Sequence, residues 1–363
     1  MSAAGIVDWR LAERVGIAIA GELAPGDGAP DRRDFGPAAA EAACREAGER
    51  VAEYTGLAPA DRIPAGEAVD RATWVRSGLR SLREVTGGLD ERLAAGIELP
   101  GPLGAAARGI AGAAAGAEAG AAVGFAGRRV LGQYDVSLVE GDRAPRLVLV
   151  EPNLATVQAE VGGSPGAFLS WVATHEVTHA AQFTGVPWLR DHLAGELRAL
   201  LDSAAEGIDA GRIGALARRL LTSDPRRTIR TLFEGELATA LAGPAQRERI
   251  DRLQATMALI EGYAEHVMDS ADPARRAERV ALRDALERRR RSRSGLGEVV
   301  ARLLGLELKL RQYRLGKAFA DAVVATGGIE ALNRAFRAPD AMPEPGELER
   351  PAGWLERTAP VPT

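Results

Sequence analysis

Two histidines four residues apart, with a glutamate directly after the first, restrict the fold of this chain more than any other feature. They lie in the stretch His175-Glu176-Val177-Thr178-His179. Residues four apart on an α-helix lie on one face, so both imidazoles can bind one metal ion if this stretch is helical. Glu176 then stands beside the metal, where its carboxylate can take a proton from a metal-bound water. The stretch, HExxH in one-letter code, therefore predicts a helix with two metal ligands, His175 and His179, and a catalytic base, Glu176.

The residues on either side of the motif are those of a buried helix. Ser164 is a good N-cap, and Pro165 suits the first helical position. Gly185 and Pro187 are typical of a helix end. Between these limits, large apolar side chains recur every three or four residues in line with the histidines: Phe168, Trp171, Val172 and Phe183. We therefore expect the metal to lie in mostly apolar surroundings, where its charge acts strongly.

A zinc ion needs a third protein ligand, and the residues nearest to the motif are poor candidates. The metzincin pattern would place a third histidine six residues after His179, but Gly185 occupies that position. His192 lies further on and is expected to be an ordinary surface residue. Glu196 lies slightly before the position at which glutamate-type zincins with short spacing place their ligand, and a surface role is favoured for it as well.

Better candidates lie in a later helical stretch, residues 259–269. Glu261 and Glu265 are four residues apart there, and His266 follows. Gly262 lacks a side chain and would let this helix approach the metal helix closely. We predict Glu261 as the third zinc ligand and Glu265 as the group that holds the other ring nitrogen of a histidine ligand. His266, Glu265 and Glu196 stay open as alternative third ligands.

The predicted site is suited to the hydrolysis of an amide, in particular a peptide bond. Three protein ligands leave one position on zinc for a water molecule, whose pKa falls to about 7. Glu176 takes a proton from this water and passes it to the leaving amine. A hydrogen-bond donor must also stabilise the oxyanion, and Tyr263, His266 and Tyr313 are candidates that the sequence does not rank.

The motif and several short segments elsewhere in the chain form an ordered set. They are residues 130–135 (VLGQYD), 151–153 (EPN), 171–179, 186–192, 261–269 (EGYAEHVMD) and 308–313 (LKLRQY). In this order they resemble the zincin-like metallopeptidase family of actinobacteria, and the resemblance extends from about Trp74 to about Trp354. It implies a zincin fold and a metal-dependent hydrolase. Members are often labelled as associated with coenzyme F420 biosynthesis, a label that reflects genomic co-occurrence and says little about the substrate.

Composition favours a cytoplasmic protein that binds neither nucleic acid nor a membrane. The net charge of −4 is not that of a nucleic-acid-binding protein. A single cysteine, Cys44, excludes an internal disulfide framework and indicates a reducing compartment. The first twenty residues carry charges throughout and lack the apolar core of a signal peptide. The Gly/Ala tract at 103–127 is interpreted as a tightly packed helix, because it contains charges and is only weakly hydrophobic.

The expected fold is mainly α with a small antiparallel β-sheet. Val136–Leu138 and Leu147–Val150 carry the strongest strand patterns, and a turn separates them. We expect an N-terminal helical region at 1–100, a zincin-like catalytic domain at 101–337 that includes a C-terminal helical lobe, and an irregular tail at 338–363. In zincins, the edge strand of such a hairpin can pair with an extended substrate, but an ordinary structural hairpin is an equal alternative.

Two other functions are compatible with the sequence. The chain could be a catalytically idle zincin scaffold that acts as a binding protein, although an idle site need not retain Glu176 with both histidines. It could also be a metal-dependent hydrolase of a small metabolite, which a deep closed pocket would favour. The substrate, the oligomeric state and any regulating partner cannot be read from the sequence.

Overall fold

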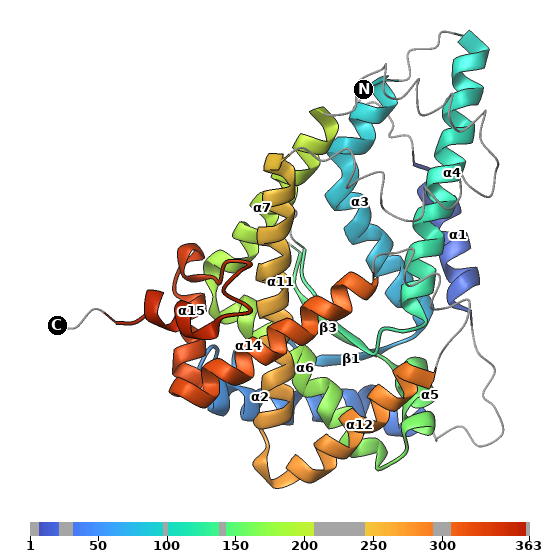
Figure 1. The fold of residues 1–363 in the computed structure, drawn as a ribbon. Helices are drawn as coiled ribbons and strands as arrows, with labels where there is room; N and C mark the ends of the chain where they lie inside the picture. The colour runs from blue at the N-terminus through green and yellow to red at the C-terminus, as the bar shows by residue number, and fades with distance from the viewer. Residues whose placement is uncertain are drawn as a thin grey trace.

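The computed structural model describes residues 7–21, 32–96, 101–137, 143–206, 244–292 and 306–360, and most of them are helical (Figure 1). The helices are α1 (Trp9–Ala20), α2 (Pro37–Thr55), α3 (Arg71–Gly96), α4 (Gly101–Gly127), α5 (Glu151–Val161), α6 (Pro165–Gly185), α7 (Pro187–Glu206), α11 (Pro244–Ser270), α12 (Arg276–Ser292), α14 (Leu306–Asn333) and α15 (Pro351–Arg357). The strands are β1 (Gly66–Val69), β2 (Gly132–Asp135) and β3 (Arg146–Val150). A mainly helical fold with a small sheet is therefore confirmed.

The sheet is mixed, whereas the sequence predicted an antiparallel one. Its order is β1-β3-β2, with β2 antiparallel and β1 parallel to the central strand β3. The first predicted strand, Val136–Leu138, is also displaced: β2 ends at Asp135, which pairs with Arg146, the first residue of β3. The next two residues, Val136 and Ser137, are not part of a strand, and Leu138 lies outside the described residues. The short strand β1 was not predicted.

Two hydrophobic cores meet at the sheet because β3 is buried on both faces. Leu147 and Leu149 belong to the larger core, and Val148 and Val150 belong to the smaller one. Alternate residues of a strand point to opposite faces, so one short run of β3 supplies both cores. The larger core surrounds α6, against which α2 and α11 pack; the smaller core lies among α1, α3 and α4 (Figure 1).

Helix α4 is held against α1 by a row of glycines. A β-carbon on Gly116, Gly120 or Gly124 would lie within 2.5 Å of a backbone oxygen of α1 or its N-cap. Only glycine allows two helix backbones to approach so closely. One stretch of the described chain, Gly104–Gly127 in α4, is long and apolar enough to span a membrane by length and composition. Its glycine-mediated contact with α1 is the close helix packing expected for the Gly/Ala tract.

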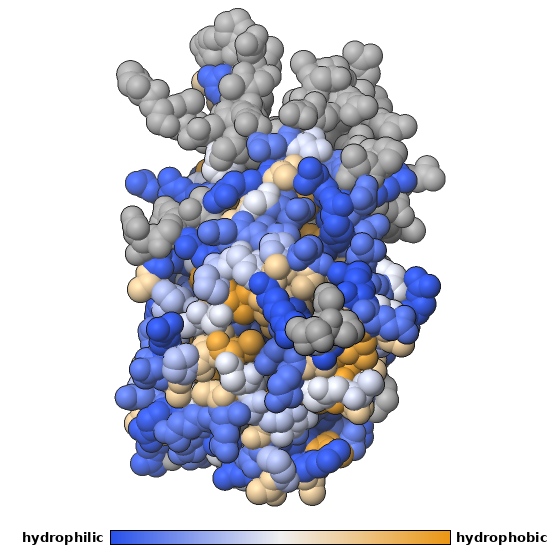
Figure 2. Space-filling view, turned by 90° about the vertical axis from the view of Figure 1, so that its left-hand side faces the viewer, coloured by the Kyte–Doolittle hydropathy of each residue, from blue (hydrophilic) through white to orange (hydrophobic). Residues whose placement is uncertain are grey.

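The predicted irregular tail at 338–363 contains a helix. Trp354 of α15 is fully buried, donates from its indole N–H to the Ala341 carbonyl at 2.9 Å, and contacts the ring of Phe319 of α14 edge-on. Helix α15 is therefore anchored in the core through Trp354. Around α15, α14 and α7, the molecular surface is mainly hydrophilic and carries small scattered apolar patches (Figure 2).

Candidate metal centre

The helix that carries the HExxH motif has the predicted bounds. Ser164 is the N-cap of α6 and accepts a hydrogen bond from the Ala167 N–H, and Pro165 is the first helical residue. The helix ends at Gly185, where a β-carbon would lie 2.0 Å from the Leu57 carbonyl oxygen. The close contact with the loop after α2 therefore requires a glycine at this position. Most of α6 is buried in the larger core, whereas the side chains of His175 and His179 remain 20% and 12% exposed.

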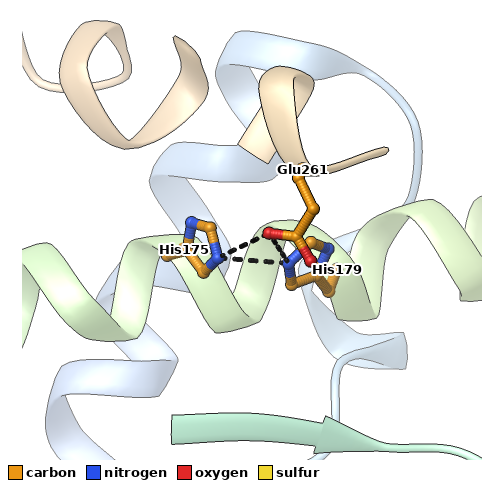
Figure 3. Close-up of side chains that lie close together, drawn as sticks. All are labelled: His175, His179 and Glu261. Carbon is orange, nitrogen blue, oxygen red and sulfur yellow. Dashed lines mark hydrogen bonds and ion pairs between the residues drawn. The ribbon is translucent and has the colours of Figure 1, made fainter. Parts of the chain in front are cut away.

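His175 and His179 of α6 and Glu261 of α11 point toward one another (Figure 3). The two histidine Nε2 atoms are 3.2 Å apart, and one Glu261 carboxylate oxygen lies 3.5 Å from the first and 3.7 Å from the second. Two nitrogen ligands of a tetrahedral zinc ion, each about 2.0–2.1 Å from it, are about 3.3 Å apart. The three side chains therefore fit a metal ion, and among the described residues they are the group that could hold one.

The charges of the site attract a cation. Burial opposes ionisation of Glu261, but the two imidazoles outweigh it and lower the pKa of this carboxyl group far below its usual value. Burial likewise opposes protonation of His179, but Glu261 and Glu176 outweigh it and raise the pKa of His179 to about 9. Without a metal, a proton supplies the positive charge that the carboxylates favour, and metal binding must release it.

Glu176 lies beside this group and is itself buried. Burial raises its pKa, Glu261 adds to the rise, and the imidazoles of His175 and His179 act against it. Its carboxylate accepts a hydrogen bond from the backbone N–H of Tyr134 in β2, the strand at one edge of the sheet. The sheet thus contributes directly to holding the side chain predicted to be the catalytic base.

A pair of glycines lets the helix that carries Glu261 approach α14 closely. Gly262 follows Glu261 and faces Gly316 of α14, whose carbonyl carbon would be 2.1 Å from a β-carbon at position 262. A β-carbon on Gly316 would in turn lie 1.9 Å from the Ala258 carbonyl oxygen. The predicted close approach is thus real, but the partner is α14 and not the metal helix, because Gly262 points to a different side of α11 from Glu261.

A fully buried glutamine that the sequence analysis did not single out links the two helices of the site. The Gln182 side chain lies 2.9 Å from Nδ1 of His179 and donates to the Ile260 carbonyl at 3.1 Å. It follows His179 by three residues, a spacing that places two side chains on one helical face, so this partner could have been found from the sequence.

Two further predicted site residues, Glu265 and His266, are bonded to other parts of the molecule. Glu265, expected to hold a histidine ligand, instead pairs with Arg283 of α12 at 3.0 Å. The two ring nitrogens of His266 are bonded to Tyr54 and Asp321, at 2.8 and 2.7 Å. These positions lie four and five residues beyond Glu261, far enough along α11 to meet other elements.

Of the two tyrosines proposed as oxyanion donors, the structure describes the side chain of Tyr263 alone, and that side chain is bonded elsewhere. The buried Tyr263 hydroxyl donates to the Asn333 side chain at 2.8 Å, because two residues along a helix turn the side chain to the opposite face. The side chain of Tyr313 lies outside the described residues. Glu196 lies 3.7 Å from Arg249, and the ring of His192 packs edge-on against Trp188.

Comparison with known proteins agrees with the geometry of the candidate metal centre. The sequence model of one family, described as zincin-like metallopeptidase, matches residues 7–355. The chain belongs to the zincin-like metallopeptidases. The resemblance that the sequence analysis found is thereby confirmed. As a zincin-like metallopeptidase the protein is expected to use a metal, and His175, His179 and Glu261 are residues that could hold it.

A comparison with curated proteins finds no match. Among solved structures, this zincin-like metallopeptidase is similar to a chain from Chloroflexus aurantiacus described as "a putative hydrolase with a novel fold". The two are 28% identical, with a TM-score of 0.65, over 98% of this chain and 100% of the other. Family and neighbour together support an enzyme of the hydrolase class.

Proposed function

We propose that this protein is a zinc-dependent peptidase that hydrolyses amide bonds at the HExxH site. His175, His179 and Glu261 would hold the zinc ion, and Glu176 would be the catalytic base. The observation that carries this proposal is the convergence of the three ligand atoms, with Nε2–Nε2 and Nε2–carboxylate distances of 3.2 to 3.7 Å. Two of the groups come from one helix and the third from a helix more than eighty residues later in the sequence.

The chain's own residues would move the proton that amide hydrolysis requires. When bound, zinc supplies a Lewis acid that polarises a carbonyl and makes water acidic near neutral pH. Glu176 accepts the proton as the water oxygen bonds to the carbonyl carbon, and it returns that proton to the nitrogen as the carbon–nitrogen bond breaks. Burial, which raises the pKa of Glu176, suits it to both steps.

The substrate that we propose is a peptide, with a small amide as the alternative within the same chemistry. The edge strand β2 supports this preference, because its residue Tyr134 contacts Glu176 directly and an exposed strand edge can pair with an extended chain. We also propose that the protein works in the cytoplasm without a nucleic-acid or membrane partner, in line with its one free, buried cysteine, Cys44.

Metal analysis combined with a peptide-library digest tests the proposal. The wild type should contain about one zinc per chain and cleave peptides. Glu176→Gln should keep the zinc and lose turnover by about 10²–10⁴-fold, because only the proton-transfer group changes. Glu118→Gln, the same change at an exposed position of α4, is the matched control.

Each negative result removes a different part of the proposal. Wild-type protein without bound metal would contradict the metal site. Zinc-loaded protein that cleaves no peptide, but hydrolyses small amides, would replace the peptidase with a hydrolase of small molecules. Zinc-loaded protein inactive on both would favour the binding scaffold, and full turnover in Glu176→Gln would exclude this residue as the base.

A further inference from the structure

We propose that Gln182 is a positioning residue of the metal site: its side-chain amide fixes the orientation of His179 and ties the HExxH helix to the backbone just before Glu261. This inference rests on the metal site of the proposed function. It assigns to a residue outside the HExxH motif the task of holding two of the three metal ligands in register.

The direction of the amide follows from the chemistry of its two partners. The carbonyl oxygen of Ile260 can only accept a hydrogen bond, so the group that faces it at 3.1 Å must be the NH₂ of Gln182. The amide oxygen is then the atom that lies 2.9 Å from Nδ1 of His179. Because this oxygen can only accept, Nδ1 of His179 must carry a proton and donate it.

A proton on Nδ1 leaves Nε2 as the ring atom for the metal. Nε2 of His179 is the atom that faces His175 and Glu261, at 3.2 and 3.7 Å. A hydrogen bond from the other ring nitrogen fixes both the tautomer and the rotation of a metal-binding imidazole. His175 has no such support among the described residues, since its Nδ1 is buried and has no hydrogen-bond partner there.

The second hydrogen bond of Gln182 connects the same imidazole to the third ligand. Ile260 directly precedes Glu261, so the backbone that carries the carboxylate is held by the amide that also holds His179. Gln182 is fully buried. If either partner moved away, one end of the buried amide would be left without a hydrogen bond, which costs free energy. The Gln182 side chain therefore holds α6 and α11 together next to the metal site.

Gln182→Met is the variant that tests this role. Methionine has nearly the length of glutamine and fills the same space, but it supplies no amide. Gln158→Met is the matched control, because Gln158 of α5 is also buried and its amide donates to the Gly163 carbonyl, away from the site. The first measurement is the zinc Kd by competition with a chelator, for which we expect a rise of about 10–100-fold in Gln182→Met and none in the control.

The second measurement is the exchange of histidine ring N–H protons in metal-free protein, observed by ¹⁵N NMR. The chain has four histidines, so the spectrum is simple. Wild type should show a slowly exchanging signal from His179 and another from His266, whose ring nitrogens are bonded to Tyr54 and Asp321. Gln182→Met should lose the first signal and keep the second, which a general loosening of the fold would not produce.

Gln182→Glu distinguishes the contact with His179 from the contact with Ile260. It also tests the proposal if the methionine variant does not fold. Its carboxylate can accept from His179 but cannot donate to Ile260, so it should keep the His179 signal while lowering Tm. Unchanged zinc affinity and an unchanged His179 signal in Gln182→Met would overturn the inference about Gln182. Wild-type protein that binds no zinc would instead overturn the proposed function, while the NMR result would still stand by itself.

Discussion

Gly132 and Glu176 share one small space: a β-carbon on the glycine would lie 2.6 Å from Cγ of the glutamate and 3.0 Å from its carboxyl carbon. The first residue of β2 therefore has to lack a side chain if the Glu176 side chain is to lie where it does. Gly132 is not among the site residues predicted from the sequence, yet it limits the position of the proposed base.

Replacing Gly132 with alanine should reduce turnover without removing the metal. The new methyl group would clash with Cγ of Glu176, so Glu176 must shift. The methyl group would also lie 2.9 Å from Leu149, which leaves it little room to move away. A displacement of about 1 Å at a reacting group can cost about 10²-fold in rate. We expect a loss of this order in kcat with zinc content unchanged. Gly195→Ala in α7, where a β-carbon meets nothing within 4 Å, is the control, and equal activity of both variants would show that Glu176 tolerates the shift.

Removing either motif histidine should remove the metal. His175→Ala and His179→Ala each take away one of three ligands, and a site with two ligands binds zinc far more weakly. Metal content after dialysis, measured by mass spectrometry, should fall to near zero. His192→Ala should keep full zinc, because this ring packs against Trp188. Retention of zinc by either of the first two variants would exclude that histidine from the site.

The two glutamates of α11 should differ in their effect on metal binding. Glu261→Ala should weaken zinc binding by more than the 10–100-fold typical of groups that only support a ligand. Glu265→Ala should leave the zinc Kd nearly unchanged, because its carboxylate pairs with Arg283 at 3.0 Å. Chelator competition on both variants decides the matter, and the reverse order of effects would identify Glu265 as the ligand.

The single cysteine should be protected from alkylation in the folded protein. Burial, with a contribution from Glu176, raises the pKa of Cys44 from 9.0 to about 12, and its exposed fraction is 2%. Since the thiolate is the reactive form, iodoacetamide at pH 9 should label native protein at least about 10³-fold more slowly than unfolded protein. Mass spectrometry follows the label, with Cys44→Ala as the blank. Rapid labelling without denaturant would contradict this burial.

The raised pKa of Cys44 also makes the stability of the folded protein depend on pH. A thiol whose pKa is raised by folding favours the folded state fully below pH 9, and this contribution is lost as the pH rises from 9 to about 12. Above pH 9, the wild type should therefore lose stability relative to Cys44→Ala, as measured by denaturant unfolding at several pH values.

Trp354 should contribute strongly to stability although it lies near the end of the chain. Its side chain is fully buried and its indole N–H is bonded to the Ala341 carbonyl. Trp354→Ala should lower the free energy of unfolding by about 3–5 kcal/mol, as for other large aromatic side chains in a core. Glu356→Ala, at an exposed position of the same helix, should change it by less than about 0.5 kcal/mol. Similar denaturation midpoints for the two variants would show that the tail is dispensable.

The parts of the site that were predictable are those encoded by local spacing. Ser164, Pro165 and Gly185 determine the helix, and its period places His175 and His179 on one face. Glu261 could be proposed from a cluster of acids, but its approach to the histidines depends on how α11 packs against α6 and α14, which spacing along the chain does not encode. Gly262 illustrates the limit: the close helix contact was foreseen, and its partner was not.

Residues that act through tertiary packing were assigned incorrectly or not at all. Glu265, His266 and Tyr263 share a short stretch with Glu261, but each meets a different neighbour: rotation about the α11 axis turns Tyr263 away, and Glu265 and His266 lie a turn or more further along the helix. Gly132 and Tyr134 act on Glu176 from a strand, so no pattern in α6 points to them. The strand β1 and the buried Trp354 were missed because short elements between Gly/Pro-rich segments carry little periodic signal.

The parallel pairing of β1 with β3 has a consequence for anyone who wishes to shorten this enzyme. Residues Gly66–Val69 form one edge of the sheet whose opposite edge strand, β2, contacts Glu176, and α2 packs directly on the HExxH helix. A fragment that began at residue 101 would retain every proposed zinc ligand and the proposed base, but it would expose β3 and one side of α6 to water. The smallest unit able to present the metal site therefore extends back at least to α2.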